Sequence, residues 1–257
     1  MGKRKVGKIV TRAGLRLEDS EINFPVAADL LKVEGVPTRN DEVSYYSREF
    51  PMDSFSSEQS ASAIWADNQR SEHSPQIAEL YRNYQKKISP WVDKILKISK
   101  KDPSNVPSGQ YPTELIREKA RSLGYGEVGF TRFDRRYIYH NRKDDVRTDL
   151  PNAICLALEQ DYKKTQTIPG LDSEIAQGEA YMKQAKLSLG LAEFLISLGY
   201  RAQISGPVWF FGPVIPMFVE CGLGQLGVNG QLLSPHFGSR ARLQIIITDA
   251  PLRYDAP

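Results

Sequence analysis

The sequence is 257 residues long, 40% hydrophobic and 25% charged, with a formal net charge of +3. Such a composition is typical of a globular protein with enough chain for one large domain or two small ones. The small, dispersed positive charge does not favour a nucleic-acid-binding protein, and no apolar run of about 18 residues is present to span a membrane. Because no apolar segment follows the basic N-terminal residues, we expect no export signal and a cytoplasmic protein.

The two cysteines, Cys155 and Cys221, lie far apart in the sequence, each within an apolar stretch. No Cys-x-x-Cys pair is present, so the sequence contains the ligands of neither a zinc ribbon nor an iron–sulfur cluster. We therefore expect buried free thiols and no metal ion held by protein ligands, with a disulfide between the two cysteines as the alternative.

The first part of the chain shows little regular pattern before a helical stretch. Residues 1–74 have no clear periodicity and predict short strands, an arm or disorder. Over 75–98, apolar residues recur at steps of three and four, which predicts a helix that Pro90 kinks or divides in two. A polar linker with prolines follows. We therefore expect an N-terminal arm and helical region over 1–110 and a second domain over 111–257.

From residue 111 onward, stretches of helical and strand periodicity alternate, which predicts a layered α/β or α+β domain. Thr113 is expected to cap the first helix of this domain and Gly124 to end it. The apolar stretch 152–159 predicts a strand buried on both faces. The expected helices cover 113–122, 173–198 and 215–221, and the expected strands cover 127–133, 152–159, 201–205 and 243–249.

A glycine-rich segment between Cys221 and Asp249 is the most distinctive feature of the sequence. Its first three glycines match the G-x-G-x-x-G pattern of dinucleotide-binding proteins, but a helical stretch precedes them and Asn229-Gly230 soon breaks the chain. A dinucleotide site is therefore disfavoured. Glycines also let a backbone approach a ligand closely and expose its N–H groups. The alternative is an irregular connection with tight turns.

The segment 222–249 resembles the corrinoid-binding region of reductive dehalogenases and of the related epoxyqueuosine reductases. The shared pattern is Gly-Leu-Gly, Asn-Gly, Ser-Pro and Phe-Gly-Ser-Arg in this order, followed by an apolar strand that ends in Thr-Asp. The resemblance covers about 111–252 and implies a nitroreductase-like α+β fold that buries a base-off cobalamin without a protein axial ligand. The positions that it assigns to cofactor binding are Gly222, Gly224, Gly227, Asn229, Gly230, Ser234, Pro235, His236, Gly238 and Ser239.

The same resemblance implies reductive cleavage of a carbon–halogen bond in a halogenated organic substrate. Tyr181 matches the proton donor and Arg240 the neighbouring arginine, and a guanidinium beside a phenol favours its ionised form and so its acidity. The alternatives are a core tyrosine and an arginine that anchors a loop. Epoxyqueuosine reductases carry an aspartate where this sequence has Ala180, which disfavours their activity here.

Two departures from the family pattern bear on activity. Trp209, Phe210 and Phe211 stand near the expected substrate position and form either an apolar wall or ordinary core. Beyond the Thr-Asp strand the family continues into cysteine-rich segments with iron–sulfur clusters, whereas this sequence ends at Pro257. We therefore expect electrons from a separate iron–sulfur or ferredoxin-type donor. The alternatives are a non-catalytic corrinoid-binding carrier or inactive fragment, an epoxyqueuosine reductase-like enzyme and, least favoured, a flavin enzyme of nitroreductase type.

Overall fold

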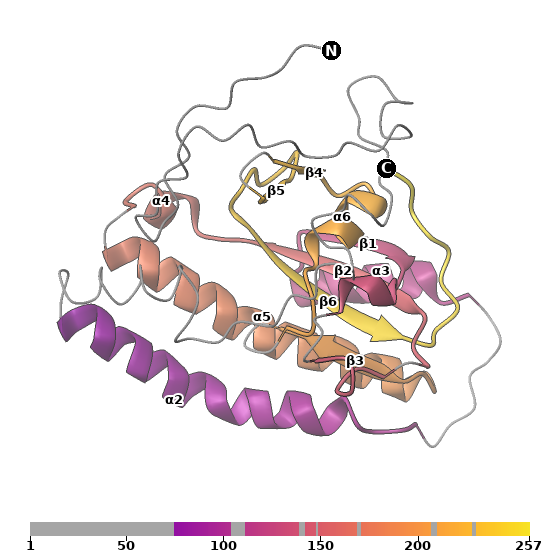
Figure 1. Cartoon of the computed structure of the whole chain (residues 1–257). Coiled ribbons are helices and arrows are strands. Elements are labelled where there is room, and N and C mark those ends of the chain that lie inside the picture. The colour runs from indigo at the N-terminus through magenta and orange to yellow at the C-terminus, as the bar shows by residue number, and fades with distance from the viewer. Residues whose placement is uncertain are drawn as a thin grey trace, which may run out of the picture.

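The computed structural model describes residues 75–103, 111–138, 142–147, 149–168, 171–206, 210–227 and 230–257. The expectations for residues 1–74, and the roles considered for Trp209 and Asn229, lie outside these residues. Within them, helices and strands form one mixed fold (Figure 1). The expected α+β class is therefore confirmed.

A four-stranded sheet forms the centre of the molecule. In spatial order its strands are β1 (Glu127–Arg132), β2 (Asn152–Glu159), β6 (Ala241–Thr248) and β3 (Ala202–Ser205). All neighbouring strands are antiparallel, and β2 and β6 pair over their whole length. The expected strands are thus confirmed, with ends shifted by one or two residues.

Strand β2 is buried on both faces, as its apolar sequence predicted. Successive residues of a strand point to opposite faces, so its side chains divide between two hydrophobic cores. Ile154, Leu156 and Leu158 enter the core against the long helices, whereas Ala153, Cys155 and Ala157 enter the core that contains Phe211, Met217 and Phe218.

Long helices cover one face of the sheet and shorter elements cover the other (Figure 1). The first face carries α2 (Pro75–Ile98), α3 (Thr113–Leu123) and α5 (Leu171–Ser197). The second carries α6 (Ile215–Glu220) and the hairpin of β4 (Gln225–Leu226) and β5 (Leu232–Leu233). Two short helices, η2 (Arg135–Tyr137) and α4 (Tyr162–Thr165), lie in the connections on either side of β2.

Helix α2 packs along α5, and its Ile88, Ile95 and Ile98 are buried in the core that α5 shares with the sheet. Gly178 of α5 permits this close approach, because a Cβ atom there would lie 2.2 Å from the ring of Tyr84. Helix α2 precedes the expected boundary between residues 110 and 111, and it packs against α5, which follows that boundary.

Pro90 does not divide α2, which runs unbroken from Pro75 to Ile98. Pro90 is exposed, so water can solvate the carbonyl that loses its helical partner. Of two expectations for α3, one is wrong and one is confirmed. Thr113 does not cap α3, because its hydroxyl accepts a hydrogen bond from the backbone N–H of Arg253 at 2.9 Å. Gly124 does end α3, with the positive φ of 113° that glycine tolerates best.

The chain after β6 runs back beside β1, which is an edge strand of the sheet. The Asp255 carboxylate accepts hydrogen bonds from the Phe130 N–H at 2.9 Å and from Arg117 at 2.8 Å. The Asp255 N–H in turn donates to the Phe130 carbonyl at 2.9 Å. Part of the outer edge of β1 is thereby covered by the molecule itself.

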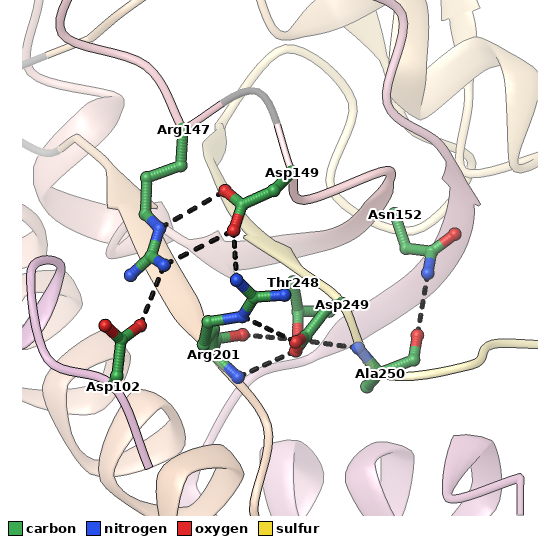
Figure 2. A network of polar contacts seen from close by, with 8 residues as sticks. All are labelled: Asp102, Arg147, Asp149, Asn152, Arg201, Thr248, Asp249 and Ala250. Atoms are coloured by element: carbon green, nitrogen blue, oxygen red, sulfur yellow. Dashed lines mark hydrogen bonds and ion pairs between the residues drawn. The ribbon is translucent and has the colours of Figure 1, made fainter.

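An ionic network joins four chain segments at the end of the sheet where β6 terminates (Figure 2). We call it the Asp149 network, and it comprises Asp102, Arg147, Asp149, Arg201 and Asp249. Arg201 binds Asp249 through its Nε at 2.7 Å and also contacts Asp149. Arg147 binds Asp102 at 2.8 Å and Asp149 at 3.4 Å. The network therefore fastens the segments that precede β2 and β3 to the segments that follow α2 and β6.

Candidate active site

Tyr181 and the last turn of the glycine-rich segment lie at the opposite end of the sheet, where β1 begins, β2 ends and β6 begins, and they pack on opposite faces of the sheet. The strand register places Glu127 opposite Ala157 and Glu159 opposite Ala241. The glycine-rich segment enters β6 at this end, so its last turn lies close to the beginning of β1. Tyr181 reaches the same end from α5, on the face that carries the long helices.

Tyr181 is held by an arginine of β6. The Arg242 Nη1 donates a hydrogen bond to the Tyr181 hydroxyl at 3.1 Å, and the guanidinium carbon lies 4.7 Å from the centre of its ring. The Gln160 amide oxygen, in the orientation that satisfies its neighbours, accepts from Nε and Nη2 of Arg242 at 2.9 Å each. The Tyr181 side chain is half-buried and packs against the core. The phenol therefore has a fixed cationic neighbour.

The arginine expected beside Tyr181 was Arg240, whereas the arginine that contacts Tyr181 in the structure is Arg242. Arg240 donates to Glu159 at 2.8 Å, and its guanidinium lies 4.7 Å from the ring centre of Tyr162. Arg240 precedes β6, and its contacts lie at the end of β2 and on α4.

The predicted cofactor glycines divide into two groups. Gly222 and Gly224 adopt positive φ values, but a Cβ there would lie 2.5 Å from the Ala256 carbonyl oxygen and 2.6 Å from that of Leu233. These two glycines therefore serve contacts within the chain. Gly230 and Gly238 also have positive φ values, 75° and 58°, but among the described residues, their chain neighbours aside, no atom would lie within 4 Å of a Cβ added there. The described part of the chain therefore leaves space beside these two glycines. Gly227 closes a turn, since its carbonyl accepts from the Gly230 N–H at 2.9 Å.

The segment Ser234–Gly238 forms a compact turn, which we call the Ser234 turn. Ser234 and Gly238 exchange two backbone hydrogen bonds, of 3.1 and 2.9 Å. The Ser234 hydroxyl oxygen accepts from the N–H groups of His236 and Phe237, each at 3.1 Å. Ser234 is buried, whereas Pro235, His236, Gly238 and Ser239 are exposed. The turn therefore presents a polar, glycine-containing tip on a fixed base.

Sequence reasoning missed Glu127, the residue on which this turn rests. The Glu127 Oε1 accepts a hydrogen bond from the Ser234 hydroxyl at 2.8 Å, and Phe237 lies over the neighbouring Gly126. Glu127 is only 6% exposed, and its Oε2 has no hydrogen-bond partner among the described residues. The signal in the sequence was an acidic residue that opens an otherwise apolar strand.

A second buried polar group on α5 was also missed. Gln184 lies three residues after Tyr181 and is fully buried, and neither its Oε1 nor its Nε2 has a hydrogen-bond partner among the residues that the structure describes. Buried amides are normally paired. The part of α5 that carries Tyr181 therefore contains a buried amide whose donor and acceptor are not used by the described residues.

The remaining candidate residues belong to the core. Phe211 is 1% exposed and packs edge-on against Phe133 at 5.6 Å, so its interpretation as ordinary core is confirmed. Cys155 and Cys221 are buried free thiols, as expected, and they lie beside one another. Burial, followed by the hydrogen bond with Cys221, raises the pKa of the Cys155 thiol well above its usual value. The Cys155 thiol is therefore a poor nucleophile in the folded protein.

The site has features that fit a large ligand with amide side chains. Gly230 and Gly238 provide open backbone at positive φ, and Glu127 and Gln184 carry polar atoms that are not paired within the described residues. No group of three or more His, Cys, Asp or Glu within the described part of the chain could hold a metal ion. None of the described helices is both long and apolar enough to cross a membrane. A corrinoid bound by backbone groups and amides is compatible with this set of residues.

Comparison with known proteins connects this geometry to one group of enzymes. No family model matches the chain. A tetrachloroethene reductive dehalogenase of Dehalobacter restrictus is 34% identical over 176 residues, which cover 66% of this chain and 29% of the relative. One of Desulfitobacterium hafniense is 37% identical over 193 residues, which cover 58% of this chain and 35% of the relative. The chain thus spans about a third of the length of these relatives.

The fold agrees with the sequence comparison. A catabolic reductive dehalogenase solved with 3-bromo-4-hydroxybenzoic acid superimposes with a TM-score of 0.58 at 21% identity, over 66% of this chain and 26% of that chain. The described fold is thus similar to that of a reductive dehalogenase. The curated relatives that the sequence matches are tetrachloroethene reductive dehalogenases, which are oxidoreductases. The expected resemblance of this chain to reductive dehalogenases is confirmed.

Proposed function

We propose that this chain binds a corrinoid and takes part in reductive cleavage of a carbon–halogen bond, with Tyr181 as the proton donor. The observation that carries the proposal is the contact between the Tyr181 hydroxyl and Arg242 at 3.1 Å. This contact lies at the same end of the sheet as the Ser234 turn. A guanidinium in contact with a phenol oxygen can stabilise the phenolate that is left when the phenol gives up its proton.

The residues that would hold the corrinoid are the exposed backbone of Gly230 and Gly238, with Pro235, His236 and Ser239 around the tip of the Ser234 turn. Asn229 stays a proposed member of this set. Bound cobalamin supplies a reducible cobalt centre for cleavage of the carbon–halogen bond. Gly222 and Gly224 act indirectly, by letting the glycine-rich segment pack against Ala256 and Leu233.

The chain's own chemical task is then proton delivery. Replacement of halogen by hydrogen consumes two electrons and one proton and releases halide. Tyr181 donates the proton from its hydroxyl, and Arg242 stabilises the phenolate that is left. Gln160 keeps the guanidinium in place through two hydrogen bonds of 2.9 Å. The electrons come from a separate low-potential donor, for which we propose an iron–sulfur protein of ferredoxin type, in the cytoplasm.

Reconstitution tests this function. The purified protein is incubated with hydroxocobalamin and desalted, and its cobalt content and visible spectrum are measured. We expect stoichiometric cobalt and a base-off spectrum. With a chemical reductant, the loaded protein should then release halide from tetrachloroethene or a bromophenol, and Tyr181→Phe should slow this release by about a hundredfold.

Each other outcome points to a different conclusion. Cobalt retention with equal halide release from wild type and Tyr181→Phe would refute the proton-donor role. Cobalt retention without halide release would favour a corrinoid carrier. A folded protein that retains no cobalt would contradict corrinoid binding by this chain.

A further inference from the structure

Glu127 is an unusual residue for the beginning of a sheet strand. Its side chain is 6% exposed, one carboxylate oxygen binds Ser234 and the other has no hydrogen-bond partner among the described residues. A buried carboxylate pays a desolvation cost that incomplete pairing does not recover. A matched pair of apolar residues would satisfy the fold at least as well. Stability alone therefore does not explain a carboxylate at this position.

Ser234 explains what the carboxylate does. The Ser234 oxygen already accepts two backbone N–H groups, from His236 and Phe237. Its single proton therefore needs an acceptor outside the turn, and Glu127 Oε1 is that acceptor at 2.8 Å. The direction of the hydroxyl, and with it the shape of the turn, is set from β1.

The Ser234 turn carries the open Gly238 at its end. Gly238 has a φ of 58°, no atom of the described residues beyond its chain neighbours would lie within 4 Å of a Cβ added there, and Ser239 beside it is exposed. A backbone that must meet a ligand at positive φ costs less binding free energy when it is held in that conformation beforehand. The Glu127–Ser234 hydrogen bond joins the base of this turn to the sheet, where Phe237 also lies over Gly126 and the His236 Nε2 lies 4.0 Å from the Glu127 Oε1.

We propose that Glu127 is a positioning residue for corrinoid binding, which acts through Ser234 to preorganise the Ser234 turn. This inference rests on the proposed corrinoid function. It predicts that the Glu127–Ser234 pair contributes to the affinity for the corrinoid more than to the stability of the fold.

Four variants separate these contributions. Glu127→Gln keeps an oxygen that accepts from Ser234 and so preserves the anchor. The double variant Glu127→Leu/Ser234→Ala removes both side chains of the pair, together with the oxygen that accepts from His236 and Phe237. Glu127→Leu alone keeps those two bonds within the turn, and it should weaken binding as the double variant does. Glu193→Ala removes an exposed carboxylate of α5 far from the turn and controls for the loss of negative charge.

The measurement is the Kd for hydroxocobalamin from titration of its visible spectrum, together with thermal unfolding and amide hydrogen exchange of residues 235–239 in the free protein. We expect the double variant to unfold within a few degrees of wild type, to bind about tenfold more weakly and to exchange faster in the turn. Glu127→Gln and Glu193→Ala should bind within about threefold of wild type.

The outcomes distinguish the inference from the function on which it rests. A wild-type protein that does not bind hydroxocobalamin refutes the corrinoid function and this inference with it. Wild-type binding that the double variant retains in full refutes the inference alone. So does a Glu127→Gln variant that binds as weakly as the double variant, because the anchor alone would then not explain the requirement.

Discussion

At the scale of single residues, Arg240, just before β6, and Arg242, within it, show the limit of what a sequence motif says about side-chain contacts. The sequence has Arg240 and Arg242 two residues apart, and only the strand register with the crossing of α5 shows that Arg242 meets Tyr181. Arg240 instead pairs with Glu159. A sequence pattern gives the order of residues along the strand, but it does not give the point at which a helix crosses that strand.

Substitution of the two arginines tests this placement. Arg242→Gln should lower the rate of halide release by the reconstituted protein about tenfold, since the phenolate of Tyr181 loses its cation. Arg240→Gln, with the same chemical change two residues away, should lower it by less than about threefold, because Glu159 is exposed and the pair it loses is weak. Halide release is followed over a range of pH for both. An equal or larger loss with Arg240→Gln would restore the original assignment.

At the scale of secondary-structure elements, the contact between α2 and α5 depends on one glycine. A Cβ at Gly178 would lie within 2.5 Å of three ring atoms of Tyr84, whose hydroxyl donates to the Ile175 carbonyl at 3.2 Å. Gly190 lies on the same helix, and a Cβ there would make only an ordinary contact of 3.5 Å with Leu123. The packing of α2 therefore requires glycine at position 178, whereas position 190 has room for a larger side chain.

Alanine substitutions at these glycines should change stability in opposite directions. Gly190→Ala gains helix propensity of about 1 kcal/mol and should raise the melting temperature. Gly178→Ala gains the same propensity but displaces Tyr84, and we expect it to lower the melting temperature and to speed amide exchange in α2. Thermal unfolding and hydrogen exchange measure both effects. A stabilised Gly178→Ala protein would show that α2 can shift away from α5 without loss.

The helices and strands were largely predictable from the sequence, whereas hydrogen bonds between residues far apart in the chain were not. The apolar run at 152–159 and Gly124 after α3 gave a buried strand and a helix end, because both signals are local. Thr113 and Glu127 were misjudged or missed for the opposite reason. Each has a partner more than 100 residues away, Arg253 and Ser234 respectively, and no local pattern indicates such a partner.

At the scale of the whole molecule, the Asp149 network ties distant segments together through charge. Burial opposes ionisation of Asp149, but the hydrogen bond from Arg147 and the charges of Arg147 and Arg201 outweigh it, so the pKa of Asp149 lies below its usual 3.8. A group with a lowered pKa in the folded state stabilises the fold above the pKa of the unfolded state. This contribution is lost as the pH falls through the lower, folded-state pKa.

A neutral substitution tests the network. Asp149→Asn should lower the melting temperature by a few degrees at pH 7, and the difference from wild type should narrow as the pH falls below about 3.8 and Asp149 itself becomes protonated. Asp144→Asn, an exposed residue of the same connection, serves as the control. If the melting temperatures of Asp149→Asn and wild type differ by the same amount down to pH 3, the charge of Asp149 does not contribute to stability and only its packing does.

The return of the chain beside β1 also bears on how the protein behaves in concentrated solution. An uncovered edge strand offers its N–H and carbonyl groups to any other strand that it meets. Asp255 occupies both backbone groups of Phe130 on that edge. A protein shortened by its last few residues would therefore keep its two cores, yet it would expose a template for intermolecular strand pairing. Self-association of such a shortened form, and not unfolding, is the failure that this contact prevents.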